Sequence, residues 1–247
     1  MDRRVRSAEI YPTRFPTRLY LRRVRQLSIC DKSSTGVFEQ AAYRNKRSMA
    51  DRVQKIREAS AQLDSLNKRI NETVRSRDRG VQEREQWSRA CAEFHAKYSE
   101  LFYPGGDASL NALKRHEPGA IELGIDFLEA DPLHFRSGYT KEEVWRRLRR
   151  APLNRREGAR LEQVALAYLA RQIGREFWIM ARVMSAIGST EFWNAVAELE
   201  ATTEEPKRTR ASYLLQYRAG ASAGEEFRKK LRMDRLMKKY REKQSRA

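Results

Sequence analysis

The sequence predicts an all-α fold, in which a helical hairpin or coiled-coil segment precedes a compact multi-helix bundle and a basic C-terminal helix. Its 247 residues include only 12 glycines and 7 prolines, the two residue types that most often interrupt helices. Helix-favouring Ala, Leu, Glu and Arg are abundant. Several stretches also place apolar side chains three and four residues apart, which is the spacing of one helical face.

The basic character of the chain is concentrated at its two ends. The formal net charge is +18. Residues 1–48 contain 12 Lys/Arg and 4 Asp/Glu, and residues 207–247 contain 14 and 4, so residues 49–206 hold 25 of each sign. Charge placed in this way suggests surfaces that meet polyanions. The alternative is that the charges only keep the ends of helices solvated.

Residues 1–48 are expected to be a basic, disordered N-terminal extension. Pro12 and Pro16 block an early helix, and no apolar period is sustained before Met49. The Arg-rich, hydroxylated and acid-poor composition is typical of a transit-type peptide, and a basic arm for nucleic acid is a second interpretation. Because the compositional break falls on a methionine, we favour a third interpretation, in which the protein starts at Met49.

Residues 49–104 contain two apolar stripes typical of paired helices. The first follows heptad positions a and d through Val53, Ile56, Leu63, Ile70 and Val74, with Ser60 and Asn67 at the remaining a positions. The second comprises Trp87, Cys91, Phe94, Tyr98 and Leu101.

Two structures fit these stripes. One is a hairpin that turns near Ser76–Gly80, with Gly80 as a left-handed cap; the other is one long helix that dimerises. The polar gap between the stripes favours the hairpin. In the second stripe, we expect Trp87, Phe94 and Leu101 to be core residues.

Residues 107–201 predict a bundle of short helices. A helix over Ala120–Ala130 is stopped by Asp131-Pro132. Thr140–Glu143 and Asn154–Glu157 have the spacing of capping boxes. A long apolar helix is expected from Leu161 to Met184. Gly188-Ser189-Thr190 would end it and cap a last helix through Leu199.

One segment of the bundle resembles a known group of proteins. Its parts are Phe127–Pro132 (FLEADP), Phe135–Tyr139 (FRSGY), Lys141-Glu142 and the triplet Arg175-Glu176-Phe177. Together they resemble uncharacterised bacterial helical proteins that share a FLEADP, FRSGY and KE block, over about residues 125–184. The resemblance implies a bacterial helical module, and it brings no activity, cofactor or site.

The connector inside this segment has two interpretations. In the structural one, Arg136 pairs with Glu129 or Asp131, and Tyr139 buries its ring. In the functional one, His134, Arg136 and Lys141 form a weak anion-binding cluster at the N-terminus of a helix beginning at Thr140.

No motif for catalysis is found in the sequence. Gly105-Gly106 lacks the following Lys-Ser/Thr of a phosphate loop, and no Gly-x-Ser-x-Gly elbow occurs. The three histidines lack zinc-ligand spacing, and Cys91 with His95 would supply only two ligands. We therefore expect a non-catalytic protein without catalytic residues, metal or cofactor.

Residues 202–247 are expected to form a linker and a basic amphipathic helix. An apolar stripe runs through Phe227, Leu231, Met233, Leu236, Met237 and Tyr240. Candidate polyanion-binding residues surround it: Lys229, Lys230, Arg232, Arg235, Lys238, Lys239, Arg241 and Lys243. The helix could dock its stripe on the bundle, bind nucleic acid, or meet another partner such as an anionic membrane surface or an acidic groove.

Compartment and function follow from these features as expectations. Cys30 and Cys91 are too few for a disulfide framework, and no apolar run reaches the length of a membrane span, so a soluble, cytoplasmic protein is expected. The favoured function is a helical interaction or adaptor protein with a protein partner or self-association through helices. The alternative is a nucleic-acid-associated protein that binds the phosphate backbone non-specifically through its basic ends.

Overall fold

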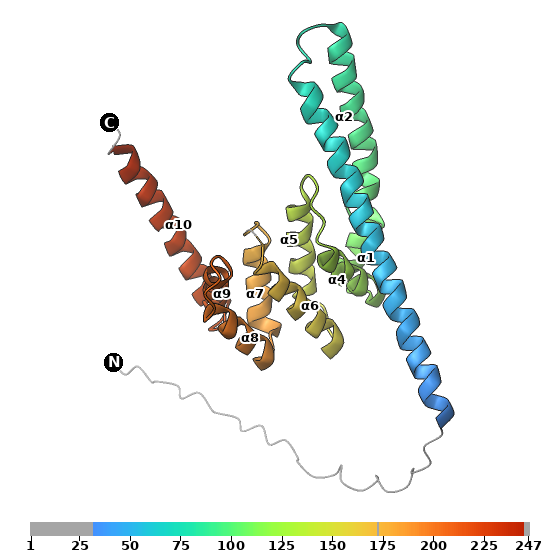
Figure 1. The fold of residues 1–247 in the computed structure, drawn as a ribbon, viewed down its shortest axis with the longest axis vertical. Coiled ribbons are helices and arrows are strands. Elements are labelled where there is room, and N and C mark those ends of the chain that lie inside the picture. Colours follow the sequence, from blue (N-terminus) through green and yellow to red (C-terminus); the bar gives the residue numbers. More distant parts are fainter. Residues whose placement is uncertain (1–31, 172, 245–247) are drawn as a thin grey trace, which may run out of the picture. The chain divides into compact units, whose positions relative to one another are not determined.

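A computed structural model describes residues 32–171 and 173–244, and within these ranges every regular element is an α-helix (Figure 1). The elements are α1 (Lys32–Val74), α2 (Val81–Leu101), α3 (Gly106–Lys114), α4 (Pro118–Ala130), α5 (Ser137–Leu148), α6 (Arg155–Tyr168), α7 (Phe177–Ile187), α8 (Thr190–Glu200), α9 (Lys207–Leu215) and α10 (Ala221–Gln244). The predicted all-α class is thus confirmed. The chain divides into residues 1–44 and 45–247, and the packing described below lies within the second unit.

Helix α1 begins at Lys32, well before Met49. Residues 32–48 are therefore helical, where the sequence had predicted disorder. The physical reason is the absence of breakers, since Gly36 is the single glycine between Lys32 and Val74 and no proline occurs there. Residues 1–31, on which Pro12, Pro16 and Cys30 fall, lie outside the described residues.

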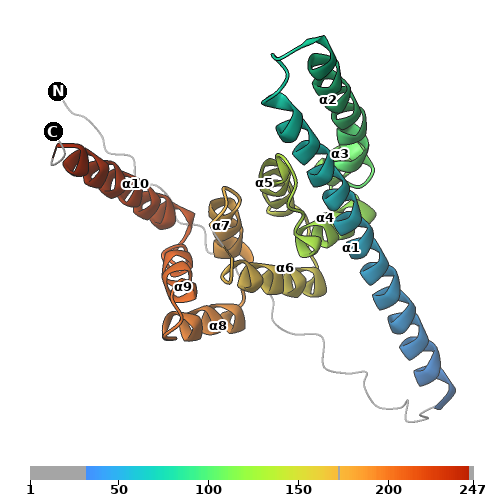
Figure 2. The same ribbon diagram turned by 45° about the horizontal axis from the view of Figure 1, so that its top comes forward.

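Helices α1 and α2 run side by side as a hairpin, as both views of the ribbon show (Figures 1 and 2). Leu63 and Leu66 of α1 are buried against Phe94 of α2. Arg69 Nη1 lies 2.5 Å from Glu93 Oε2 across the pair. The heptad pattern thus identified Leu63 correctly as a residue of the buried face of α1. It omitted Leu66, which is buried in the same interface.

The turn and the upper part of α2 differ from the sequence-based expectation. Gly80 has φ −170° and is the extended residue before α2, so it is not a left-handed cap. Phe94 is buried as predicted, at 4% exposure. Trp87 and Leu101 are only half-buried, because the interface of two helices covers a narrow strip of α2, on which Ala90 and Phe94 are the buried residues.

The bundle core lies among α3 to α9. Its largest fully buried side chains are Tyr103, Phe127, Trp145, Phe177 and Tyr217. Ile56 of α1 belongs to the same core. The base of the hairpin is therefore packed into the bundle rather than attached only by the chain.

Several helix ends follow the predicted signals. Pro118 begins α4, and Asp131 ends it in the left-handed region at φ 49°. At α6, Asn154 accepts a hydrogen bond from the Glu157 amide (3.0 Å), and Glu157 accepts one from the Asn154 amide (2.8 Å). Ser189 likewise accepts from the Phe192 amide (3.1 Å) at the start of α8.

The start of α5 and the middle of the bundle do not follow the predictions. Thr140 is a buried first-turn residue of α5, since the helix already begins at Ser137, so no capping box forms there. The expected helix from Leu161 to Met184 is divided into α6 and α7. Gly174 lies in the break, and a Cβ atom built on it would be 2.5 Å from Glu176 Oε2. The connector there must therefore pass close to a buried carboxylate.

None of the helices in the described ranges has the length and apolar character needed to cross a bilayer.

Candidate interaction surface

Helix α10 is fixed to the bundle by its first turns. Phe227 packs on Tyr213 of α9, with ring centres 5.6 Å apart. Gly224 rests directly on Tyr217, because a Cβ atom at Gly224 would lie 2.3 Å from the Tyr217 ring. The base of α10 is thus held by close apolar packing.

Glu225 is the polar anchor of the same region. Its Oε1 accepts a hydrogen bond from the Tyr217 hydroxyl (3.2 Å) and pairs with Arg182 Nη2 of α7 (2.6 Å). Burial, followed by the negative charge of Glu225, raises the pKa of Tyr217 to about 12. Tyr217 therefore stays a neutral hydrogen-bond donor at physiological pH, and α10 leaves the bundle from a defined position.

Beyond these turns, α10 exposes apolar side chains. Met233, Leu236 and Met237 are 57%, 50% and 47% exposed, and their spacing places them along one face of the helix. The interpretation in which the whole stripe docks on the bundle is wrong, since only Phe227 and Leu231 are half-buried. The side chain of Tyr240 lies outside the described residues.

The predicted polyanion-binding cations surround this stripe. Seven of the eight are exposed, while the side chain of Lys243 is outside the described residues. Lys238 Nζ lies 4.0 Å from Glu242 Oε1. Among the described residues, six of them form no ion pair: Lys229, Lys230, Arg232, Arg235, Lys239 and Arg241. Their charge remains available to a partner.

A pocket rich in arginine lies at the base of α10, with a volume of about 160 Å³. Its lining comprises Glu142, Arg146, Arg175, Trp178, Ile179, Arg182, Glu225 and Arg228. The arginines are partly neutralised, since Glu142 pairs with Arg146 (2.7 Å) and with Arg175 (2.6 Å). Four arginines face two glutamates, so the lining keeps an excess of positive charge.

A second hollow of about 500 Å³ continues from Trp178 along α10. It is lined by Trp178, Arg228, Leu231, Arg232, Arg235, Leu236, Lys238, Lys239 and Glu242. It shares Trp178 and Arg228 with the arginine pocket. We call the two hollows and the stripe of Met233, Leu236 and Met237 the α10 surface. It combines apolar contact area with cations, and a pairing of this kind suits an acidic, amphipathic partner.

The predicted anion cluster of His134, Arg136 and Lys141 is not formed as a set of free cations. His134 is buried, with Nδ1 3.2 Å from Ser60 Oγ. Burial, followed by the nearby charge of Lys141, lowers the pKa of His134 to about 4, so the ring is neutral at physiological pH. Arg136 is exposed and lies against the ring of Tyr139.

Lys141 is instead the centre of a buried ion-pair network. The side chain is in α5 and its residue is 2% exposed. Nζ lies 3.0 Å from Asp131 Oδ1 and 3.2 Å from Glu176 Oε1. Arg171 also pairs with Asp131. The charge of this buried lysine is satisfied by two carboxylates, so it is not available to an external anion.

This network connects the parts of the segment that contains FLEADP, FRSGY and KE. Asp131 belongs to its FLEADP part, Lys141 to its KE part and Glu176 to its Arg-Glu-Phe triplet, and the three side chains meet in one place. The predicted ion pair of Arg136 with Glu129 or Asp131 does not form. Glu129 pairs with Arg160 (2.7 Å) instead, and Asp131 pairs with Arg171. The segment therefore joins α4, α5 and the start of α7 into one corner.

Tyr139 also departs from the structural interpretation. Its ring is exposed rather than buried, and the guanidinium of Arg175 lies 3.5 Å from the ring centre. The arginine pocket itself could not be seen in the sequence, since Arg146, Arg182 and Arg228 come from α5, α7 and α10. The available signal was the excess of arginine alone, and it does not say which arginines meet.

No family model, curated protein or solved structure matches this chain.

Proposed function

We propose that this protein is a non-catalytic helical interaction or adaptor protein, and that it binds an acidic, amphipathic helical segment of another protein on the α10 surface. The observation that supports this most is the exposed stripe of Met233, Leu236 and Met237 among exposed cations. Full burial of a Leu or Met side chain is worth roughly 1.5–3 kcal/mol. Because about half of each side chain is still exposed, covering the stripe would contribute roughly 1 kcal/mol per residue.

The charge of the surface determines the kind of partner. The two hollows are lined by eight Lys/Arg and three Glu, so an acidic segment would gain from complementary charge. A second copy of α10 is disfavoured, because its cations would face those of the first. A helical partner fits the stripe, since apolar groups three and four residues apart match an opposing helix.

The exposed cations of α10 also favour a second candidate, non-specific binding to the phosphate backbone of nucleic acid. Phosphate contacts would use the cations but would need no apolar stripe. The two candidates therefore differ in which side chains of α10 they require. They also differ in salt dependence, because release of counterions makes binding to duplexes fall steeply as salt rises.

The test uses two variants of the full chain with substitutions at exposed positions. The first is Met233→Ser/Leu236→Ser/Met237→Ser, which removes the stripe and keeps the charge. The second is Lys229→Gln/Lys230→Gln/Lys239→Gln, which keeps the stripe. The probes are a synthetic acidic helix with leucine at its a and d positions and a short DNA duplex, each followed by fluorescence anisotropy across a salt series.

We expect the serine variant to lose about 100-fold in affinity for the acidic helix, from roughly 3 kcal/mol of lost burial, and to bind the duplex as wild type does. The glutamine variant should bind both probes less tightly. Unchanged binding of the acidic helix by the serine variant would contradict the proposal. Tight duplex binding without any binding of the acidic helix would support the nucleic-acid candidate instead.

A further inference from the structure

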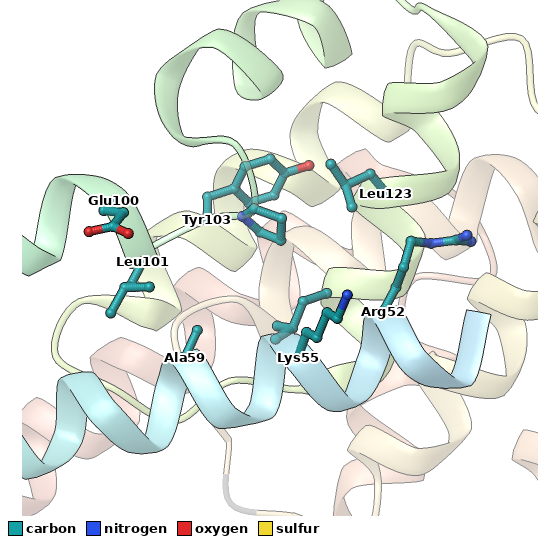
Figure 3. A pocket seen from close by; sticks show the side chains of 9 residues that line it. Arg52, Lys55, Ala59, Glu100, Leu101, Tyr103 and Leu123 are labelled. Carbon is teal, nitrogen blue, oxygen red and sulfur yellow. The ribbon is translucent and has the colours of Figure 1, made fainter. Parts of the chain in front are cut away.

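A separate pocket lies at the base of the hairpin, between α1, the end of α2 and α4 (Figure 3). Its volume is about 320 Å³. It is lined by Arg52, Lys55, Ile56, Ala59, Glu100, Leu101, Tyr103, Pro104 and Leu123. None of these residues belongs to the α10 surface. The pocket forms where α2 ends and the chain turns through Pro104, so that α2 no longer covers α1.

The walls of this pocket are mostly apolar. Ala59 of α1 lies on one side, and Leu101 and Leu123 lie across from it (Figure 3). Ile56 of α1 also lines the pocket. Tyr103 is fully buried, and its hydroxyl has no hydrogen-bond partner among the described residues. Burial raises the pKa of Tyr103, so this wall carries no charge at physiological pH. Such walls suit a hydrocarbon chain better than a polar ligand.

The charged residues of the rim differ in their ion pairs with other described residues. Arg52 pairs with Asp126 (2.5 Å) and Glu122 (3.4 Å), and Glu100 pairs with Lys97 (2.9 Å). Lys55 forms no ion pair within the part of the chain that the structure describes. Its side chain points from α1 toward the wall that holds Tyr103 and Leu123 (Figure 3).

We propose that this pocket binds a medium-chain monocarboxylate, whose hydrocarbon chain lies against the apolar walls and whose carboxylate pairs with Lys55. The volume suits a small ligand: at about 30 Å³ for each water-sized group, it holds roughly ten such groups. A carboxylate with eight carbons has that size. A single ammonium group matches one negative charge, whereas a polyanion would find, among the described lining residues, one cation without an ion pair.

The test is isothermal titration calorimetry of the full chain with octanoate, octan-1-ol and octylammonium. Octanoate should bind tightest of the three, and octylammonium weakest because Lys55 repels it. Lys55→Gln should weaken octanoate binding about five-fold, the scale of a partly exposed ion pair, and leave octan-1-ol binding unchanged. Lys68→Gln is the matched control, because Lys68 is an exposed α1 lysine outside the pocket, and it should bind all three as wild type does.

A second variant tests the apolar part of the pocket. Ala59→Phe places a ring into the space and should weaken both octanoate and octan-1-ol, with circular dichroism confirming that the helices are retained. If this variant does not fold, the comparison of Lys55→Gln with Lys68→Gln decides the test alone. The proposal is overturned if octanoate does not bind the full chain, or if octan-1-ol binds equally well. It is also overturned if Lys55→Gln leaves octanoate affinity unchanged.

Discussion

Replacement of Lys141 by methionine should destabilise the bundle strongly. The lysine is 2% exposed, and its ammonium group bridges Asp131 and Glu176. Removal of one partner from a buried ion pair leaves an uncompensated charge and typically costs about 3–5 kcal/mol. Asp131 would keep Arg171, so the uncompensated group is Glu176. We therefore expect a loss near the lower end, about 3 kcal/mol in the free energy of unfolding.

The assay is urea unfolding followed by circular dichroism, with two companion variants. Lys141→Met/Glu176→Gln removes the uncompensated charge and should recover most of the lost stability. Lys97→Met removes an exposed lysine that pairs with Glu100, and it should cost less than about 1 kcal/mol. The reasoning is refuted if Lys141→Met unfolds within about 1 kcal/mol of wild type, or if the double variant is no more stable than the single one.

Two further predictions test the hairpin and the corner that it contacts. Phe94→Ala should lower the free energy of unfolding by about 3 kcal/mol, because Phe94 is the buried centre of a small cluster with Leu63 and Leu66. Val81→Ala, at an exposed position, is the control. A near-neutral result for Phe94→Ala would contradict the prediction, because it would show that the cluster adds little stability. For His134, the pKa lies near 4 in the folded chain and near 6.5 when unfolded. The unfolded chain thus binds the extra proton first, and stability should fall as the pH is lowered from about 6.5 to about 4. His134→Gln should remove that part of the slope in pH-dependent unfolding, and an unchanged slope would contradict the assigned burial.

The sequence predicted best those features that depend on neighbours along the chain. Pro118 at the start of α4, Asp131-Pro132 after it and the Asn154–Glu157 capping box all act within a few residues. Phe94 was found because heptad spacing identifies the buried face of a helix pair. Local signals misled at Thr140, where α5 had already begun at Ser137.

The features that the sequence did not predict depend on residues far apart in the chain. The functional interpretation of the connector took Lys141 as a free cation, because nothing in its neighbourhood along the chain shows that Glu176 reaches it. The apolar pocket also needs α1, the end of α2 and α4 together, so its lining from Lys55 to Leu123 has no local pattern. The exposed stripe of α10 was visible as a stripe, but only packing decides which of its residues are covered.

The two ends of the hairpin differ in their contacts, and Ser60 marks the end that is attached to the bundle. Its hydroxyl accepts the Leu133 amide (2.9 Å) and thereby ties one level of α1 to the bundle. Nearer the tip, described contacts such as that of Arg77 with the Trp87 ring (5.3 Å) stay inside the hairpin. We therefore expect a change in the length of the hairpin near its tip to leave the stability of the bundle unchanged. A matched heptad added to α1 and α2 near the tip should therefore extend the hairpin by about 10 Å without repacking the core.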